Sequence, residues 1–207
     1  YSVPTFTEYQ SSYNGEGDHP YSQLDGDDLV PDIAIGRLPI RNTDNMATIT
    51  SKIIGYEKAF TNLQGQNEWF ERGALIGDPS DSGISTIITN EYIQQIMEYQ
   101  GFEDIRTNFG NGSYSNWMTN QLSDGVLYFN YRGFYGVSGF TSNSIDQTNN
   151  GFQLPFVSVI TCGTGSFKNE SVCLSEKFVV AGSAANPKGG VVAIGTATTG
   201  THTMYNN

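Results

Sequence analysis

The side chain in this sequence best suited to nucleophilic chemistry is the thiol of Cys162. It follows the apolar run FVSVIT and precedes the turn GTGS, so a strand is expected to end directly before it. A thiol that leaves a strand into a glycine-rich turn lies beside backbone N–H groups, which favour both a thiolate and a developing oxyanion. The same pattern also fits a buried cysteine that closes a strand, and the local residues do not decide between the two.

Carboxylates and a guanidinium follow two other apolar runs. Asp78 and Asp81 come after residues 74–77, and Arg132 comes directly after residues 126–131. The carboxylates could orient a base or bind a cationic group of a substrate, although such residues more often cap turns and helices. The guanidinium could bind a substrate carboxylate, or pair with an acidic neighbour, which is the more common case for a single arginine.

Strands must position these side chains. Short runs rich in valine, isoleucine and aromatic residues, several of them apolar on both faces, are typical of a covered parallel sheet. The predicted strands are residues 33–36, 74–77, 104–107, 126–131, 156–161 and 191–195. All of them except 33–36 and 104–107 are expected to be neighbours in one sheet. Loops converge at the carboxyl ends of such strands, so Cys162 should lie there, partly exposed.

Amphipathic stretches between the strands predict helices. One begins with Thr43 as its N-cap and carries Met46, Ile49, Ile53, Tyr56 and Phe60 on one stripe. A second helix begins near Ser85 and carries the stripe Ile88, Tyr92, Ile96 and Tyr99. A short third helix follows Ser115 and carries Trp117, Met118 and Leu122. A fourth helix covers residues 171–181. The alternation of strands and helices indicates an α/β fold with a mainly parallel sheet flanked by helices.

The composition is that of a folded, acidic protein. Hydrophobic residues make up 37% of the 207 residues, and 21 Asp and Glu against 10 Lys and Arg give a formal charge of −11. This charge repels a phosphate backbone, so no nucleic-acid partner is predicted. No apolar run has the ~20 residues of a membrane-spanning helix. Tyr1 is not an initiator methionine, and both ends read as cuts in a larger precursor.

No cofactor or metal is predicted. Cys162 and Cys173 form no CxxC pair, and Cys173 lies in an apolar helical pattern where it would pack as a small hydrophobic residue. A disulfide between the two is the less favoured alternative. The acidic run DGDD at residues 25–28 offers oxygen ligands for a structural calcium ion. It lacks the spacing of an EF-hand, so a solvated acidic loop is the preferred interpretation.

Taken in order, several motifs resemble the catalytic domain of the gingipain-type cysteine peptidases, which have a caspase-like fold. These motifs are GDHPYSQLDGDDLVPDIAIGRLP, IIGYEKAF, WFERGALIGD, QLPFVSVITCGTGSF, CLSEKFV and KGGVVAIGTAT. The resemblance divides the chain into residues 1–70, the C-terminal part of a first α/β subdomain, and residues 71–207, a catalytic-type α/β subdomain. It also implies a protein or peptide substrate and a secreted or cell-surface location.

The same resemblance aligns Cys162 with the nucleophile of the family. It implies an oxyanion site formed by backbone amides of Gly133 and Tyr135. The family supplies its catalytic histidine from a Gly-His-Gly turn, which reads Gly133-Phe134-Tyr135 in this chain. Phe134 cannot take up or give a proton, so the usual partner of the thiol is replaced.

Two histidines could take over this task. His19 is interpreted as structural, whereas His202 follows residues 191–195, whose carboxyl end lies at the same sheet edge as Cys162. His202 is therefore the candidate base, although a loop histidine without a role is the more common case. The predicted function is a gingipain-like cysteine endopeptidase. The alternative is a catalytically impaired pseudopeptidase used for binding or sorting of surface proteins.

Substrate specificity is not predicted. Thr86 falls near the place where Arg-specific members of the family carry an acidic residue. Without a carboxylate there, the sequence gives no reason to expect cleavage after arginine or lysine.

Overall fold

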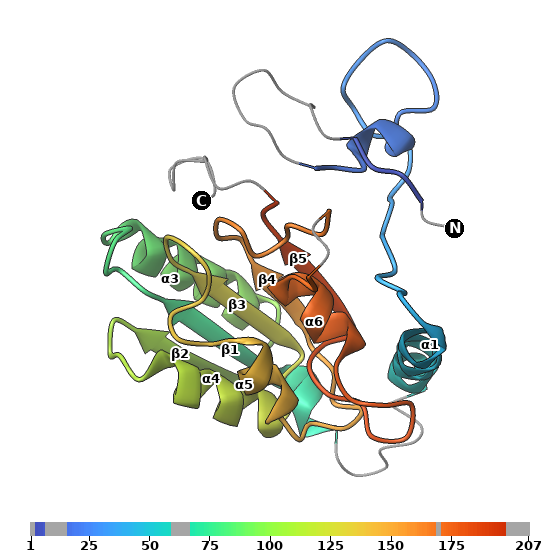
Figure 1. Cartoon of the computed structure of the whole chain (residues 1–207). Coiled ribbons are helices and arrows are strands. Elements are labelled where there is room, and N and C mark those ends of the chain that lie inside the picture. The colour runs from blue at the N-terminus through green and yellow to red at the C-terminus, as the bar shows by residue number, and fades with distance from the viewer. Residues whose placement is uncertain (1–2, 7–15, 59–66, 169–170, 198–207) are drawn as a thin grey trace.

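A parallel sheet of five strands forms the centre of the protein (Figure 1). The computed structural model describes residues 3–6, 16–58, 67–168 and 171–197. The strands are β1 (Arg72–Gly77), β2 (Asp104–Phe109), β3 (Tyr128–Arg132), β4 (Phe156–Val159) and β5 (Val192–Gly195). Their order is β2-β1-β3-β4-β5, and every pairing is parallel. The predicted α/β class and the predicted neighbours in the sheet are confirmed.

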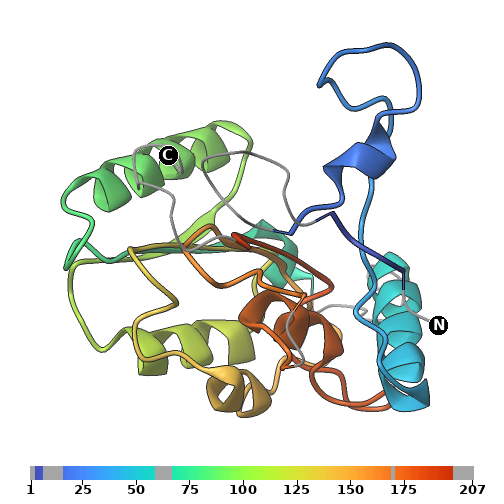
Figure 2. The same cartoon turned by 45° about the horizontal axis from the view of Figure 1, so that its top comes forward.

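Helices cover both faces of the sheet (Figure 2). The helix α3 (Ser85–Tyr99) lies on one face, and α4 (Tyr114–Ser123), α5 (Ser142–Asp146) and α6 (Leu174–Val180) lie on the other. The helix α1 (Thr43–Glu57) lies beside α6 at the side of these layers. Two short 3-10 helices, η1 (His19–Ser22) and η2 (Glu68–Glu71), precede α1 and β1.

The face beneath α4, α5 and α6 holds the main apolar core. Its buried side chains include Ala74, Ile76, Phe129, Val157 and Val159 from the strands, and Met118, Leu122, Ile145 and Phe178 from the helices. The ring of Phe178 lies 6.0 Å from that of Phe129 and 5.9 Å from that of Phe140, measured between centroids. Burial of each large apolar side chain stabilises the fold by about 1.5–3 kcal/mol. These contacts hold three helices on one side of the strands.

On the opposite face, polar side chains take part in docking α3, which the helical pattern did not predict. The expected apolar stripe of α3, made of Ile88, Tyr92, Ile96 and Tyr99, is 43% to 88% exposed. Thr86, Asn90 and Met97 are buried instead. The Asn90 amide donates to the carbonyl oxygen of Ile76 at 2.9 Å and accepts from the Asn130 amide at 2.7 Å. A Cβ on Gly77 would lie 2.9 Å from the Thr86 carbonyl oxygen, so the helix approaches too closely for large apolar side chains.

The start and the buried face of α1 also differ from the prediction. Asn42, not Thr43, is the N-cap, and its side chain accepts a hydrogen bond from the backbone N–H of Asn45 at 2.8 Å. Of the predicted stripe, Ile49 is buried, but Met46 is 57% exposed. The reason is that α1 contacts its neighbours through only one narrow face, and that face is centred on a lysine.

Lys52 is this buried residue, with 1% of its surface exposed. Its ammonium group donates to the carbonyl oxygens of Phe178 at 2.9 Å, Lys188 at 2.5 Å and Gly190 at 3.2 Å. Burial lowers the pKa of Lys52 to about 7, and the positive charge of Lys177 adds to the shift. The side chain therefore ties α1 to α6 and to the loop before β5.

Residues 33–36 form no strand, contrary to the prediction. Next to them, the guanidinium of Arg37 forms an ion pair with Asp18 at 2.7 Å and donates to two backbone carbonyls near the N-terminus. It also lies 5.0 Å above the ring centroid of Phe167. Side-chain contacts of this kind hold the segment in place of a strand ladder. The predicted domain boundary after residue 70 stays a prediction.

Two further findings concern only the described parts of the chain. No helix in them is both long and apolar enough to cross a membrane. They contain no group of three or more His, Cys, Asp or Glu side chains that could hold a metal ion.

Replacing Asn90 by alanine tests the polar contact between α3 and the sheet. We expect Asn90→Ala to lower the free energy of unfolding by about 1–3 kcal/mol, because the buried Asn130 amide loses its acceptor. Urea denaturation measures this change. The control Gln95→Ala lies on the exposed side of the same helix and should change the free energy by no more than about 0.5 kcal/mol. Equal losses in the two variants would contradict a structural role of the Asn90 contacts.

The lowered pKa of Lys52 predicts how stability changes with pH. Its folded value of about 7 lies below the ~10.4 of an unfolded lysine, so between these pH values the unfolded chain binds the extra proton. The contribution of Lys52 to the free energy of unfolding should therefore rise with pH in this window, by at most about 1.4 kcal/mol per pH unit. Lys52→Met should remove this rise in urea denaturation series, whereas the exposed control Lys58→Met should keep it. Parallel curves for the parent and Lys52→Met would show that Lys52 does not titrate there.

Candidate active site

Cys162 lies just beyond β4, at the carboxyl edge of the sheet. The Thr161 N–H donates to the carbonyl oxygen of Val159 at 2.8 Å, which turns the chain directly after the strand. The Gly136 N–H donates to the carbonyl oxygen of Cys162 at 3.1 Å, and Tyr135 and Cys162 form an isolated parallel bridge. The turn of residues 133–136 therefore lies alongside the cysteine.

The thiol is less accessible than predicted. Cys162 is 5% exposed, so the expected partial exposure is wrong. The ring of Tyr135 lies next to the following residue, with its hydroxyl 3.4 Å from the place of a Cβ on Gly163. Neither Cys162 nor Cys173 forms a disulfide, which rules out the alternative bridge. Cys173 is the N-cap of α6, and burial raises its pKa to about 11.

The turn beside the thiol requires glycine at its first position. A Cβ on Gly133 would lie 2.4 Å from the hydroxyl oxygen of Tyr131, whose side chain is 1% exposed and has no room to move. Phe134 and Tyr135 follow on the surface, with 51% and 65% of their area exposed. The sequence assigned Gly133 from the family resemblance, and the contact with Tyr131 supplies a physical reason for it.

Asp78 anchors the same turn from the neighbouring strand β1. Its carboxylate accepts hydrogen bonds from the Ser138 hydroxyl and from the Ser80 hydroxyl at 2.6 Å and backbone N–H at 3.0 Å. The Ser138 hydroxyl also lies 2.7 Å from the Tyr131 hydroxyl. Burial alone would raise the pKa of Asp78, but the hydrogen bonds from Ser138, Ser80 and Tyr114 outweigh it, and the pKa is lowered. Asp78 thus caps its own turn and also holds the turn at residues 133–138.

Arg132 is the last residue of β3 and is 2% exposed. Its guanidinium donates to the carbonyl oxygen of Ile160, two residues before Cys162. Burial lowers the pKa of Arg132, and the negative charge of a Cys162 thiolate opposes this shift. The guanidinium is therefore held next to the backbone that leads into Cys162.

The other residues singled out in the sequence lie elsewhere. His202 lies outside the described residues. The Nε2 atom of His19, a residue of η1, lies 2.9 Å from the carbonyl oxygen of Leu29 in the following loop. This contact is consistent with a structural role of His19. Thr86 is fully buried, and its hydroxyl donates to the Gly83 carbonyl oxygen at 3.2 Å. A residue in that position cannot contact a substrate.

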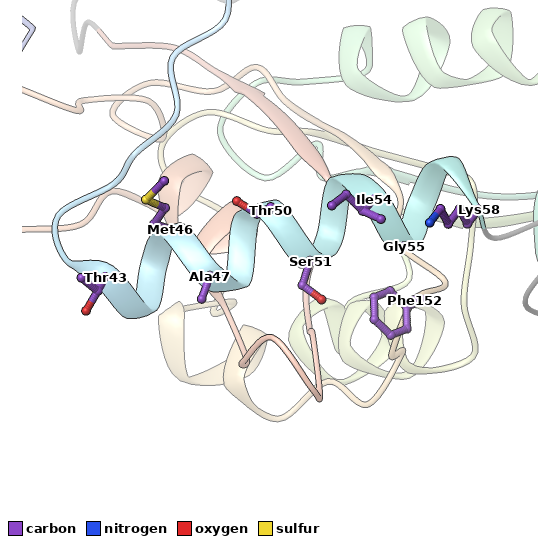
Figure 3. Close-up of a pocket in the computed structure, with 9 residues that line it drawn as sticks. All are labelled: Thr43, Met46, Ala47, Thr50, Ser51, Ile54, Gly55, Lys58 and Phe152. Atoms are coloured by element: carbon purple, nitrogen blue, oxygen red, sulfur yellow. The ribbon is translucent and has the colours of Figure 1, made fainter.

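Two pockets were found in the described part of the chain, and Cys162 lines neither of them. One, of about 700 Å³, follows α1 and is also lined by Phe152, which lies beside Gly55 (Figure 3). Among the described residues that line it, only Lys58 is charged. The other, of about 600 Å³, lies between β5 and residues 35–39 and reaches Gly165 and Gly195 near the carboxyl edge of the sheet. The geometry around Cys162 marks the candidate site.

Sheet and site define an α/β domain with a cysteine at the carboxyl end of an inner strand. The model of peptidase family C25 matches residues 1–207, and the chain belongs to this family. It is 26% identical to gingipain R2 of Porphyromonas gingivalis over 189 residues, which cover 86% of this chain and 25% of that protein. The identity to gingipain R1 of the same species is also 26%, over 19% of its length. The chain spans a quarter or less of these relatives.

Solved structures show the same fold. The crystal structure of the Arg-specific cysteine proteinase gingipain R aligns with a TM-score of 0.79 and 24% identity, over 93% of this chain and 46% of that one. A complex of the pro- and mature domains of Porphyromonas gingivalis RgpB gives the same TM-score and identity, over 47% of its chain. The caspase-like fold is therefore confirmed.

Replacing Asp78 by asparagine tests its hold on the turn. Because the pKa of Asp78 is lowered in the folded state, its ionised form stabilises the fold above the ordinary value of ~3.9. That contribution disappears as the pH falls through the lowered value. Asp78→Asn should cost about 1–3 kcal/mol at neutral pH and less in acid, measured by thermal melting at both. The exposed control Asp81→Asn should melt like the parent. A loss for Asp78→Asn that is equal at both pH values would refute a role for its charge.

Proposed function

We propose that this domain hydrolyses peptide bonds in protein or peptide substrates, with the thiol of Cys162 as nucleophile. The observation that carries this proposal is the position of Cys162 at the carboxyl edge of the sheet, beside the turn of residues 133–136. Membership of a peptidase family supports the class of reaction. The description of its structural relative as a cysteine proteinase supports the use of a thiol.

The chemistry has two stages. In the first, the thiolate attacks the carbonyl carbon of the scissile bond, a C–S bond forms, and the carbonyl electrons move to the oxygen. The backbone N–H groups of Gly133 and Tyr135 stabilise this oxyanion. The C–N bond then breaks, the amine leaves with a proton, and a thioester remains. In the second stage, water attacks the thioester and releases the acid and the thiol.

The proton transfers need a group other than the residue at position 134. Phe134 has no ionisable group, so it cannot accept the thiol proton or protonate the leaving amine. We assign both tasks to His202, because it follows β5, whose carboxyl end lies at the same sheet edge as Cys162. General acid–base catalysis of this kind contributes about 10²–10⁴-fold to a rate.

A second candidate function is a pseudopeptidase that keeps the fold for binding or sorting of surface proteins. Two observations favour it. Phe134 stands where the resemblance expects a histidine, and Cys162 is 5% exposed. A nucleophile with so little exposed surface is poorly placed to reach a substrate.

The proposal also includes the cellular location of the protein and the length of its precursor. We infer a secreted or cell-surface location, on the basis of the family resemblance and the acidic, lysine-poor composition. We also infer that the chain is part of a larger precursor, since it spans 25% of gingipain R2 and 19% of gingipain R1.

Substitutions at the site distinguish the two functions. If the domain is a peptidase, Cys162→Ala should abolish hydrolysis of a protein substrate, and His202→Ala should lower the rate by about 10²-fold or more. Phe134→His should raise it, because an imidazole beside the thiol can transfer protons. The matched control Cys173→Ala should leave the rate unchanged. Hydrolysis of casein and labelling with a peptide that carries a thiol-directed electrophile are the two measurements.

The outcomes separate clearly. Hydrolysis that persists in Cys162→Ala would disprove the assignment of the nucleophile. Hydrolysis that needs Cys162 but not His202 would disprove the assignment of the base. If the parent neither hydrolyses protein nor reacts with the peptide electrophile, the pseudopeptidase is the correct function.

A further inference from the structure

The residue directly before Cys162 is fully buried and has a hydrogen-bond partner for each of its polar groups. This residue is Thr161, two positions beyond the end of β4. Its N–H donates to the carbonyl oxygen of Val159 at 2.8 Å. Its carbonyl oxygen accepts from the hydroxyl of Thr164 at 2.8 Å and from the N–H of the same residue at 3.3 Å. Local hydrogen bonds therefore fix the backbone that leads into the candidate nucleophile.

The hydroxyl of Thr161 holds the turn of residues 133–136. It donates to the carbonyl oxygen of Gly136 at 2.7 Å. The next residue adds a second contact, because the carbonyl oxygen of Cys162 accepts from the Gly136 N–H at 3.1 Å. Two consecutive residues thus bind both backbone groups of Gly136, its donor and its acceptor. The turn is joined to the same short segment of chain that carries the thiol.

A side chain makes the first of these contacts because regular strand pairing has already ended. The pairing of β3 with β4 stops at Tyr131 and Val159. Gly136 has a φ of +58°, in the left-handed region that strands do not use. At this point Thr161 supplies from its side chain the kind of hydrogen bond that backbone N–H groups supply within the sheet. Valine has nearly the same shape but no hydroxyl, so it could not supply this bond.

We propose that Thr161 is a positioning residue, whose hydroxyl keeps the backbone N–H groups of Gly133 and Tyr135 in place relative to the thiol of Cys162. An oxyanion donor is effective only where it is already aimed at the oxygen of the transition state. A turn that shifts away from the nucleophile loses this aim, and a displacement of about 1 Å can cost about 10²-fold in rate. The effect of Thr161 on hydrolysis rests on the proposed function, but its hold on the turn does not.

Thr161 and Asp78 hold the turn from different strands. Asp78 reaches it from β1 through the hydroxyl of Ser138. Thr161 reaches it from the segment after β4, which also carries the thiol. A threonine hydroxyl does not ionise between acid and neutral pH, so the hold of Thr161 is the same at both. The two residues therefore differ in an experiment, because only the contribution of Asp78 changes with pH.

Amide exchange tests the hold on the turn and needs no catalysis. Thr161→Val replaces the hydroxyl by a methyl group and removes no atom from the hydrogen bond between the Gly136 N–H and Cys162. If Thr161 restrains the turn, the Gly136 amide should exchange about tenfold faster in this variant, as the loss of one buried hydrogen bond implies. Hydrogen–deuterium exchange followed by NMR measures the rate.

Two further variants serve as controls. Thr161→Ser keeps the hydroxyl and should keep the slow exchange of the Gly136 amide. Thr148→Val makes the same chemical change at another fully buried threonine, whose hydroxyl donates to the carbonyl oxygen of Ile145 at 2.8 Å. Thr148 lies in the loop before β4, at the opposite edge of the sheet. Because a turn exchanges by local opening, Thr148→Val should leave the Gly136 rate unchanged.

The kinetics of casein hydrolysis test the effect on the reaction. Contacts to the oxyanion form in the transition state and not in the bound substrate. Thr161→Val should therefore lower kcat about tenfold or more and leave KM nearly unchanged. Thr161→Ser should keep most of kcat, and Thr148→Val should match the parent. Rates are expressed per folded molecule, so a loss of stability alone does not produce this split.

Several results would overturn the inference. One is a folded Thr161→Val variant whose Gly136 amide exchanges like that of the parent. Another is a Thr161→Ser variant that behaves like Thr161→Val, which would show that the methyl group rather than the hydroxyl matters. A faster exchange with an unchanged kcat would refute the role in catalysis. If Thr161→Val does not fold, the parent decides: its Thr161 hydroxyl proton must appear in the NMR spectrum as a slowly exchanging donor. A parent that shows the hold on the turn but cleaves no protein would refute the proposed function alone.

Discussion

The parallel pairing of β3 with both β1 and β4 is the constraint on which the rest of the structure depends. Gly77 pairs with Arg132 and Tyr131 pairs with Val159, so the three strands end at nearly the same level. Parallel strands bring their carboxyl ends to one edge, and residues far apart in the sequence meet there. Backbone register thus brings the carboxylate of Asp78, the guanidinium of Arg132 and the turn that carries Cys162 to the same edge of the sheet.

Side chains then fix the turn after β3 on both sides. Towards β1, Ser138 is held by Asp78 and by Tyr131. Towards β4, the Gly136 carbonyl oxygen accepts from the Thr161 hydroxyl at 2.7 Å, and its N–H donates to Cys162. A turn held in this way keeps the direction of its N–H groups without help from a bound substrate. This preorganisation is what stabilisation of an oxyanion requires.

The inner strands β1, β3 and β4 were predictable because strands that are buried on both faces form continuous apolar runs. The same reasoning failed at residues 33–36, which form no strand. Which faces of the helices are buried was not predictable in this way. The stripe of α3 assigned to the core is exposed, because Asn90 and the close approach at Gly77 set how the helix docks. The buried face of α1 is likewise centred on Lys52, whose three carbonyl partners come from residues 178–190. Helical periodicity describes one segment at a time, whereas these contacts join segments that only the fold brings together.

The candidate site, too, was predictable only in part from the sequence. Cys162 was found from the strand and turn around it, but its burial, and the roles of Asp78 and Arg132, depend on distances between strands that no local pattern contains. The same distances limit what this edge of the sheet can do in the proposed reaction. Moving a proton to a leaving amine needs a group that can release one, and neither the buried guanidinium of Arg132 nor Phe134 can. In the proposed reaction, proton transfer therefore falls to a side chain outside the strands.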